Sequence, residues 1–251
     1  MSKCRVIIVM PAYNVGLVIG KTLASIPVGT YEKIIVVDDG SSDHTAEAAA
    51  KAGATVVRHP ANRGYGAAQK TGYKKALEMG VDIVVLVHGD NQYDPAFVPQ
   101  FVSKILAEGC DLVTGTRMKL GDALQRGMPV WKFIPNRLLT VLENCVFGSC
   151  ISDYHNGFRA YTAKFLKEIP LDLLSDKFDF DTDIIVQGTI RKYKIGEVAH
   201  PTRYSRENSQ MPFGKAVVYG LSILRTVAIF VLYKMGVCKQ KIFSLEEKCH
   251  E

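Results

Sequence analysis

Short apolar segments alternate with segments of helical spacing along the first half of the chain. The apolar segments predict strands at residues 5–10, 33–38, 55–58, 83–87 and 111–116. Between them, residues 17–26, 43–52, 65–79 and 95–108 predict helices, the last three marked at one end by a capping residue, a glycine or a proline. Because strands that alternate with helices form βαβ units, we expect an α/β fold with a mostly parallel central sheet flanked by helices.

The alternation ends after residue 117. Residues 118–135 combine glycine, proline and scattered charge, which predicts a long loop of the kind that often covers a binding site. Beyond it, we expect helices at residues 132–146 and 181–191 and short strands at residues 194–198 and 201–204. We expect the polar residues 237–251 to form a loose end.

Residues 216–233 are nearly all apolar but include an arginine, Arg225. At helical spacing one side of this segment is wholly apolar and carries Val217, Val218, Leu221, Leu224, Ala228, Val231 and Leu232. The stripe favours an amphipathic helix over a membrane span, in which a central arginine would be costly. Packing on the domain core and contact with a membrane surface fit this pattern equally.

Composition narrows the class of ligand. The chain has 251 residues, 47% of them hydrophobic, which is enough for one large core. Its net charge of +6 suits phosphate-bearing ligands or an anionic membrane surface. No stripe of Lys and Arg interleaved with aromatic residues appears, so we expect no nucleic-acid binding. Six cysteines without a CxxC pair, and a strand that starts near the amino terminus, predict reduced thiols and a cytoplasmic location.

Two of the predicted strands end in acidic residues, at the edge of a parallel sheet where ligands bind. The strand predicted at residues 33–38 runs into Asp38 and Asp39. The strand predicted at residues 83–87 runs into residues 88–92, His-Gly-Asp-Asn-Gln. If this segment is extended, His88, Asp90 and Gln92 lie on one side and could hold a divalent cation. Taken alone, His88 is more commonly a buried histidine with satisfied hydrogen bonds. Asp38 is a ligand candidate, although the segment is also favourable turn chemistry, whereas Asp90 is a carboxylate just past a buried strand and needs a partner.

Other motifs have the chemistry of phosphate binding. A glycine-rich segment, residues 62–68, opens a predicted helix, and its N–H groups with Arg63 could hold a phosphate, although a plain helix start fits as well. Arginines and lysines suited to diphosphates fall in or beside irregular segments: Arg117, Arg126, Lys132, Arg137, Arg159, Arg203, Arg206 and Lys215. The polar residues 153–159 could meet a second ligand or form a turn at Asn156-Gly157.

In their order and spacing these motifs resemble the inverting family 2 glycosyltransferases of the GT-A fold, and most closely the dolichyl-phosphate mannose and glucose synthases. The matching segments are residues 10–14 (Met-Pro-Ala-Tyr-Asn), 36–43, 62–66, 88–92, 115–117 and 153–159. The resemblance implies a GT-A domain over residues 1–212, with a nucleotide-binding half at 1–117 and an acceptor half at 118–212. The amphipathic helix at 213–236 follows.

The resemblance also implies a role for single residues. The nucleotide would contact Pro11, Ala12, Tyr13, Asp38, Asp39, Arg63 and Gly64, with Asp38 bonded to the base. The metal motif maps onto His88, Asp90 and Gln92. The catalytic residues would be Asp90, Arg117 and Asp153. The acceptor and its phosphate would contact Arg126, Arg203, Arg206 and Lys215.

Two positions depart from the family pattern. Val15 stands where a glutamate usually follows Pro-Ala-Tyr-Asn, which removes a nucleotide contact. His88 stands where the metal motif has its first aspartate. A nitrogen ligand shifts the preference from Mg²⁺ towards Mn²⁺ and leaves both ions open.

The resemblance implies a metal-dependent transfer of a sugar from a UDP- or GDP-linked donor to a polyprenyl phosphate, with the protein on the cytosolic face of a membrane. A related enzyme could use a glycan or other hydroxyl acceptor, which needs a general base such as Asp90, Asp94 or Asp153. A nucleotidyltransferase and a non-catalytic nucleotide-sugar binding protein are further alternatives. The sequence indicates neither the sugar nor the oligomeric state.

Overall fold

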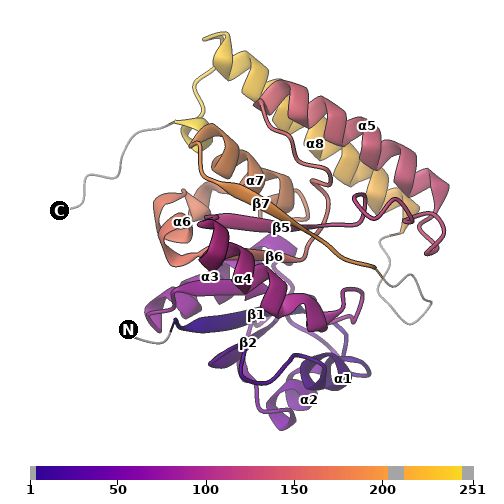
Figure 1. Ribbon diagram of the computed structural model, residues 1–251, viewed down its shortest axis with the longest axis vertical. Helices are drawn as coiled ribbons and strands as arrows, with labels where there is room; N and C mark the ends of the chain where they lie inside the picture. Colours follow the sequence, from indigo (N-terminus) through magenta and orange to yellow (C-terminus); the bar gives the residue numbers. More distant parts are fainter. Residues whose placement is uncertain (1–3, 203–211, 245–251) are drawn as a thin grey trace.

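The computed structural model describes residues 4–202 and 212–244, and its centre is a seven-stranded sheet of order β3-β2-β1-β4-β6-β5-β7 (Figure 1). The strands are β1 Val6–Ala12, β2 Lys33–Asp38, β3 Thr55–Arg58, β4 Ile83–Leu86, β5 Leu112–Thr116, β6 Arg159–Thr162 and β7 Ile195–Ala199. Every neighbouring pair is parallel except those of β6, which runs antiparallel to β4 and β5. The expected α/β fold with a mostly parallel sheet is confirmed.

Helices cover both faces of the sheet. They are α1 Ile19–Ala24, α2 Thr45–Lys51, α3 Tyr65–Glu78, α4 Val98–Glu108, α5 Val130–Phe147, α6 Ala163–Glu168, α7 Phe180–Ile190 and α8 Phe213–Lys234, with single 3₁₀ turns at η1 Pro95–Phe97, η2 Leu171–Leu173 and η3 Lys241–Phe243. One apolar cluster joins α1, α2 and α4 to the sheet, and a second joins α3, α6 and α7 to its other face. Ile8 of β1 faces the first and Ile7 the second, which is why the strand reads as one apolar run.

Helices α5 and α8 lie side by side, apart from the sheet (Figure 1). Ile223, Val227 and Phe230 of α8 are buried in a third cluster with Phe147 of α5 and Ile185 of α7. The opposite side of α8 is exposed: Val217, Val218, Leu221, Leu224, Val231 and Leu232. The predicted stripe is therefore not the side that packs on the core. Within the described residues, α8 is also the helix long and apolar enough to cross a membrane.

Several predicted boundaries differ from the structure. The long loop ends at Pro129, because α5 begins at Val130 and includes Pro135. The strand expected at residues 201–204 is reduced to one bridge between Tyr93 and Thr202, and its end lies outside the described residues. The expectation of a loose end is wrong as far as Ser244, because Phe243 is buried against Phe230, with ring centroids 5.1 Å apart.

Candidate functional site

A cavity of about 790 Å³ lies at the carboxyl ends of β1, β2, β4 and β5, the edge where ligands of parallel sheets bind. Its sheet end is lined by residues that follow these strands and by the loops beside them: Pro11, Ala12, Tyr13, Asp39, Gly64, His88, Asp90, Gln92 and Arg117. Its other end lies between α5 and α8 and is lined by Trp131, Lys132, Pro135, Leu139, Phe213, Lys215, Val217 and Gly220. Most of the predicted site residues thus meet in one cavity.

Asp39 ties the glycine-rich segment to the end of β2. Its carboxylate accepts hydrogen bonds from the backbone N–H groups of Arg63 and Gly64, each at 2.9 Å, and lies 2.6 Å from His59 Nδ1. Gly64 has a φ of +109°, and a Cβ there would lie 2.4 Å from the carbonyl oxygen of Asp176, so only glycine fits. Arg63 contributes its backbone, and its side chain is not part of the cavity wall in the described residues.

Asp38 points away from the cavity. Its carboxylate accepts a hydrogen bond from the backbone N–H of Ser41 at 2.9 Å and pairs with Arg58 Nε at 3.2 Å. The resemblance implies a nucleotide contact for both residues, with Asp38 bonded to the base. Of the two, Asp39 lines the cavity and Asp38 does not, because side chains alternate along the end of β2.

The segment after β4 turns instead of running straight on. Asn91 has a φ of +57°, and Asp90 Oδ1 accepts a hydrogen bond from the backbone N–H of Gln92 at 3.0 Å. The extended geometry expected for His88, Asp90 and Gln92 is therefore wrong, since Gly-Asp-Asn is favourable turn chemistry. Asp90 and Gln92 still line the cavity. Burial raises the pKa of Asp90 to about 6, because it outweighs the backbone hydrogen bond from Gln92, which lowers the pKa.

His88 has a different environment from that of a metal ligand. Its Nε2 lies 2.7 Å from the hydroxyl of Tyr65, and its ring packs edge-on against Tyr65 and Tyr93. Burial and the charge of Arg159 lower the pKa of His88 to about 3, so the ring is neutral. In the described residues, no group of three His, Cys, Asp or Glu side chains could hold a metal ion. The predicted ligand set is therefore reduced to Asp90 and Gln92.

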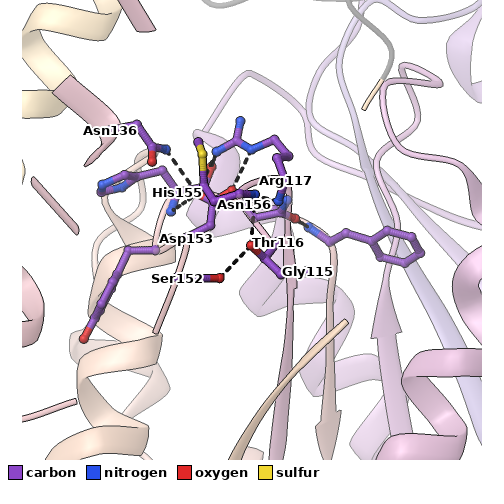
Figure 2. A network of polar contacts seen from close by, with 12 residues as sticks. Gly115, Thr116, Arg117, Asn136, Ser152, Asp153, His155 and Asn156 are labelled. Carbon is purple, nitrogen blue, oxygen red and sulfur yellow. Dashed lines mark hydrogen bonds and ion pairs between the residues drawn. The ribbon is translucent and has the colours of Figure 1, made fainter. Parts of the chain in front are cut away.

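Arg117 and Asp153 form a buried ion pair between β5 and the segment before β6 (Figure 2). Arg117 Nε and Nη2 donate to the two carboxylate oxygens of Asp153 at 2.7 and 2.8 Å, and Asn136 Nδ2 adds a third hydrogen bond at 3.1 Å. Burial alone would raise the pKa of Asp153, but Arg117 and Asn136 hold it well below its usual range. A carboxylate held in this way is a weak base, which disfavours Asp153 as the general base that a hydroxyl acceptor would need.

The predicted phosphate-binding residues separate into three groups. Lys215 lines the cavity, as does Lys132, whose pKa is lowered by burial and by the charge of Arg117. Arg126 does not: it pairs with Asp122 four residues earlier, Nε to Oδ2 2.6 Å, on the exposed loop before α5. Arg203 and Arg206 lie outside the described residues.

Two polar clusters in the site were not predicted. Asp181, at the start of α7, lines the cavity beside Tyr65. Glu143 of α5, which is fully buried, lies 3.2 Å from His155 Nε2, and His155 Nδ1 lies 3.0 Å from the hydroxyl of Tyr219 on α8. No motif marks Asp181 or Glu143 in the sequence. Their polarity within apolar helices is the only signal that could have found them.

Comparisons with known proteins agree with this geometry. The family model described as glycosyl transferase family 2 matches residues 7–170. An uncharacterised protein of Methanocaldococcus jannaschii is 35% identical over 224 residues, which are 89% of this chain and 91% of that protein. UDP-N-acetylglucosamine–dolichyl-phosphate N-acetylglucosaminyltransferase of Methanococcus voltae is 27% identical over 253 residues, covering 94% and 98%.

A solved structure shows the same fold. Glucosyl-3-phosphoglycerate synthase from Mycobacterium tuberculosis, in complex with Mn²⁺, UDP and phosphoglyceric acid, matches with a TM-score of 0.71 at 23% identity, over 95% of this chain and 81% of that one. The family model extends from β1 to just beyond the end of α6, so it includes every strand that borders the sheet end of the cavity. The chain therefore belongs to glycosyl transferase family 2 and has its GT-A fold.

Proposed function

We propose that the protein transfers a sugar from a nucleotide-diphosphate sugar to a polyprenyl phosphate at a membrane surface. One observation carries this proposal: a single cavity joins a polar end at the sheet to a largely apolar end between α5 and α8, and basic side chains line both ends. A nucleotide diphosphate suits the first end and a phosphorylated hydrocarbon the second. The dolichyl-phosphate acceptor named for the Methanococcus voltae relative supports the same class of substrate.

The polar end fits a divalent cation that is shared with the donor. Asp90 and Gln92 offer a carboxylate and an amide to the cavity, and Asp90 is buried with a raised pKa, as a carboxylate without a cationic partner would be. Two protein ligands leave coordination positions for diphosphate oxygens. Bound there, Mg²⁺ or Mn²⁺ would neutralise negative charge on the leaving diphosphate. Mn²⁺ and UDP in the glucosyl-3-phosphoglycerate synthase complex support this assignment.

Arg117, Lys132 and Lys215 are the groups that would hold the acceptor phosphate. Arg117 follows β5, Lys132 belongs to α5 and Lys215 to α8, and all three line the cavity. Lys132 lies beside Trp131, with its Nζ 5.0 Å from the ring centroid. Arg117 and Lys132 are partly buried, which makes their charges more effective towards an anion than they would be in water, whereas Lys215 is exposed.

In the proposed reaction the bond between the sugar C1 and the diphosphate oxygen breaks, and the electron pair leaves with the diphosphate. A phosphate oxygen of the acceptor forms the new bond to C1 from the opposite face, which inverts the configuration. The acceptor is already ionised near neutral pH, so no proton has to be removed. The commitment of Asp153 to Arg117 supports this choice over a hydroxyl acceptor, which would need a general base.

The exposed faces of α5 and α8 provide the membrane contact in this proposal. Helix α5, like α8, has exposed apolar residues: Val130, Trp131, Ile134, Leu138 and Val141. Trp131 belongs both to this group and to the cavity wall, so the apolar end of the cavity continues into the exposed face. An apolar helical face of this kind lies in the interface of a bilayer, with basic side chains near the lipid headgroups.

A direct test of the reaction compares acceptors. With purified protein, Mn²⁺ and UDP- or GDP-sugars, we expect transfer to a C₅₅ polyprenyl phosphate and none to the matching polyprenol. Lys132→Ala and Lys215→Ala should each raise the KM for the lipid phosphate about tenfold, because each removes one charge-assisted contact. Transfer to the polyprenol or to a glycan would contradict the proposal, as would failure to bind any nucleotide diphosphate.

A second test addresses the membrane face. Val218→Asp combined with Leu221→Asp should weaken binding to vesicles of phosphatidylglycerol and phosphatidylcholine by about tenfold, because charge replaces two exposed apolar side chains. Co-sedimentation measures this binding. Leu106→Asp on α4 is the matched control, since Leu106 is also exposed but lies on another helix. Equal binding of the double variant and the control would exclude this face as the membrane contact.

A further inference from the structure

We infer that Asp181 binds hydroxyl groups of the donor's sugar. The inference rests on the proposed function and names the residue that distinguishes a nucleotide sugar from a free nucleotide. Asp181 lies in the first turn of α7, opposite the start of α3, and its carboxylate borders the cavity. The nearby residues Gly64, Tyr65, Phe178 and Gly157 complete this part of the cavity wall.

The carboxylate of Asp181 is held in a fixed position by three donors. Gln69 Nε2 lies 3.3 Å from Oδ1, the hydroxyl of Tyr65 lies 3.3 Å from Oδ2, and Arg159 Nη1 lies 3.5 Å from Oδ1. Asp181 as a whole is 8% exposed, so its remaining access is to the cavity. Burial raises the pKa of Asp181 in spite of Arg159, which indicates that the carboxylate would gain from further donors.

Tyr65 is itself fixed by the residue that departs from the family pattern. The hydroxyl of Tyr65 lies 2.7 Å from His88 Nε2. It is therefore hydrogen-bonded both to the neutral histidine after β4 and to the carboxylate of Asp181 on α7. A Cβ at Gly157 would lie 2.3 Å from His88 Nε2, which shows how closely the backbone before β6 covers this ring. His88 is therefore a positioning residue for Tyr65 and, through it, for Asp181.

The surroundings of Asp181 match the chemistry of a sugar. A carboxylate accepts hydrogen bonds from neighbouring hydroxyl groups, and each such bond to a charged group is stronger than a neutral one. Phe178 is 43% exposed and stacks on Tyr65, with ring centroids 5.2 Å apart, so its outer face is open to the C–H groups of a sugar ring. Asp90 lines the same cavity, and His88, two residues before Asp90, contacts Tyr65. Asp181 thus lies in the same cavity as a sugar attached to a diphosphate at Asp90.

The test is a calorimetric titration of wild type and Asp181→Asn with Mn²⁺ present. The titrants are UDP-N-acetylglucosamine, UDP-glucose and GDP-mannose, each compared with free UDP or GDP. For the donor that the wild type binds, we expect Asp181→Asn to weaken binding by about tenfold or more and to leave the free nucleotide within about twofold. Tyr65→Phe should produce a smaller loss of the same kind.

Asp183→Asn is the matched control, because Asp183 is equally buried on the same helix but does not line the cavity. It should change neither titration. An equal loss of donor and free nucleotide in Asp181→Asn would overturn the inference, since it would mean a damaged fold. Unchanged donor binding with loss of transfer would also overturn it, because a general base acts on the acceptor. If the wild type binds neither UDP nor GDP, the proposed function itself fails.

Discussion

Asp90→Asn is expected to lower the rate of sugar transfer about a thousandfold, equivalent to ~4 kcal/mol in the barrier. Of the carboxylates after β2 and β4 that line the cavity, Asp39 is occupied by Arg63, Gly64 and His59. In the proposed reaction, Asp90 is therefore the carboxylate that would hold the cation that balances the leaving diphosphate. Asparagine keeps the hydrogen bond from the N–H of Gln92, so the turn should survive while the charge is lost.

The measurements are kcat at saturating Mn²⁺ and the affinity for UDP with and without Mn²⁺. The gain in UDP affinity on adding Mn²⁺ should disappear in Asp90→Asn. Asp82→Asn is the control, because Asp82 lies just before the opposite end of β4, where its carboxylate accepts the N–H of Arg5. Transfer by Asp90→Asn within about tenfold of the wild type would show that the cation is not bound there.

Arg117→Ala is expected to reduce the free energy of unfolding by about 3–5 kcal/mol at neutral pH. The loss arises because Asp153, which is fully buried, would keep its charge without its main partner. Urea denaturation measures it. Arg126→Ala removes a comparable pair on the exposed loop and should cost less than about 1 kcal/mol. A cost no larger than that of Arg126→Ala would contradict the account of this pair.

The same pair predicts a dependence on pH. Because the folded state depresses the pKa of Asp153, its contribution to stability is complete above the unfolded value of about 3.9 and is lost as the pH falls below it. In Arg117→Ala the carboxyl is easier to protonate, so the difference from the wild type should narrow as the pH falls towards 4. Arg117→Ala combined with Asp153→Asn should recover part of the stability, since no buried charge remains.

The sheet could be predicted because β1, β2, β4 and β5 are buried on both faces and their sequences are therefore apolar runs. β6 escaped prediction, since Arg-Ala-Tyr-Thr is not such a run. Its Arg159 is fully buried only because backbone carbonyls of Tyr154, Asn156 and Asp181 accept its N–H groups. One of these carbonyls belongs to Asp181 on α7, and those of Tyr154 and Asn156 depend on the conformation of the segment before β6, so an apolar or alternating pattern does not show the compensation.

The candidate site was predicted in its components more than in its geometry. The order of the motifs identified the cavity residues, because each motif follows a strand whose end is fixed by the sheet. The orientation of single side chains was not accessible: whether Asp38 or Asp39 faces the cavity depends on where β2 ends, and the turn at Asn91 redirects the segment after β4. Asp181 depends on how α7 packs beside α3, which no pattern in α7 reveals.

The reversed direction of β6 has a consequence for where variation in this chain can affect its chemistry. Elsewhere in the sheet the site is built by residues that follow a strand, but β6 brings to the cavity residues that precede it, His155 and Gly157. Arg159 pairs with Leu86 at the end of β4, whereas Thr162 pairs with Ile83 at its start. Insertions after residue 162 would therefore lie at the edge of the sheet opposite the cavity. A single substitution just before residue 159 would instead change the cavity wall.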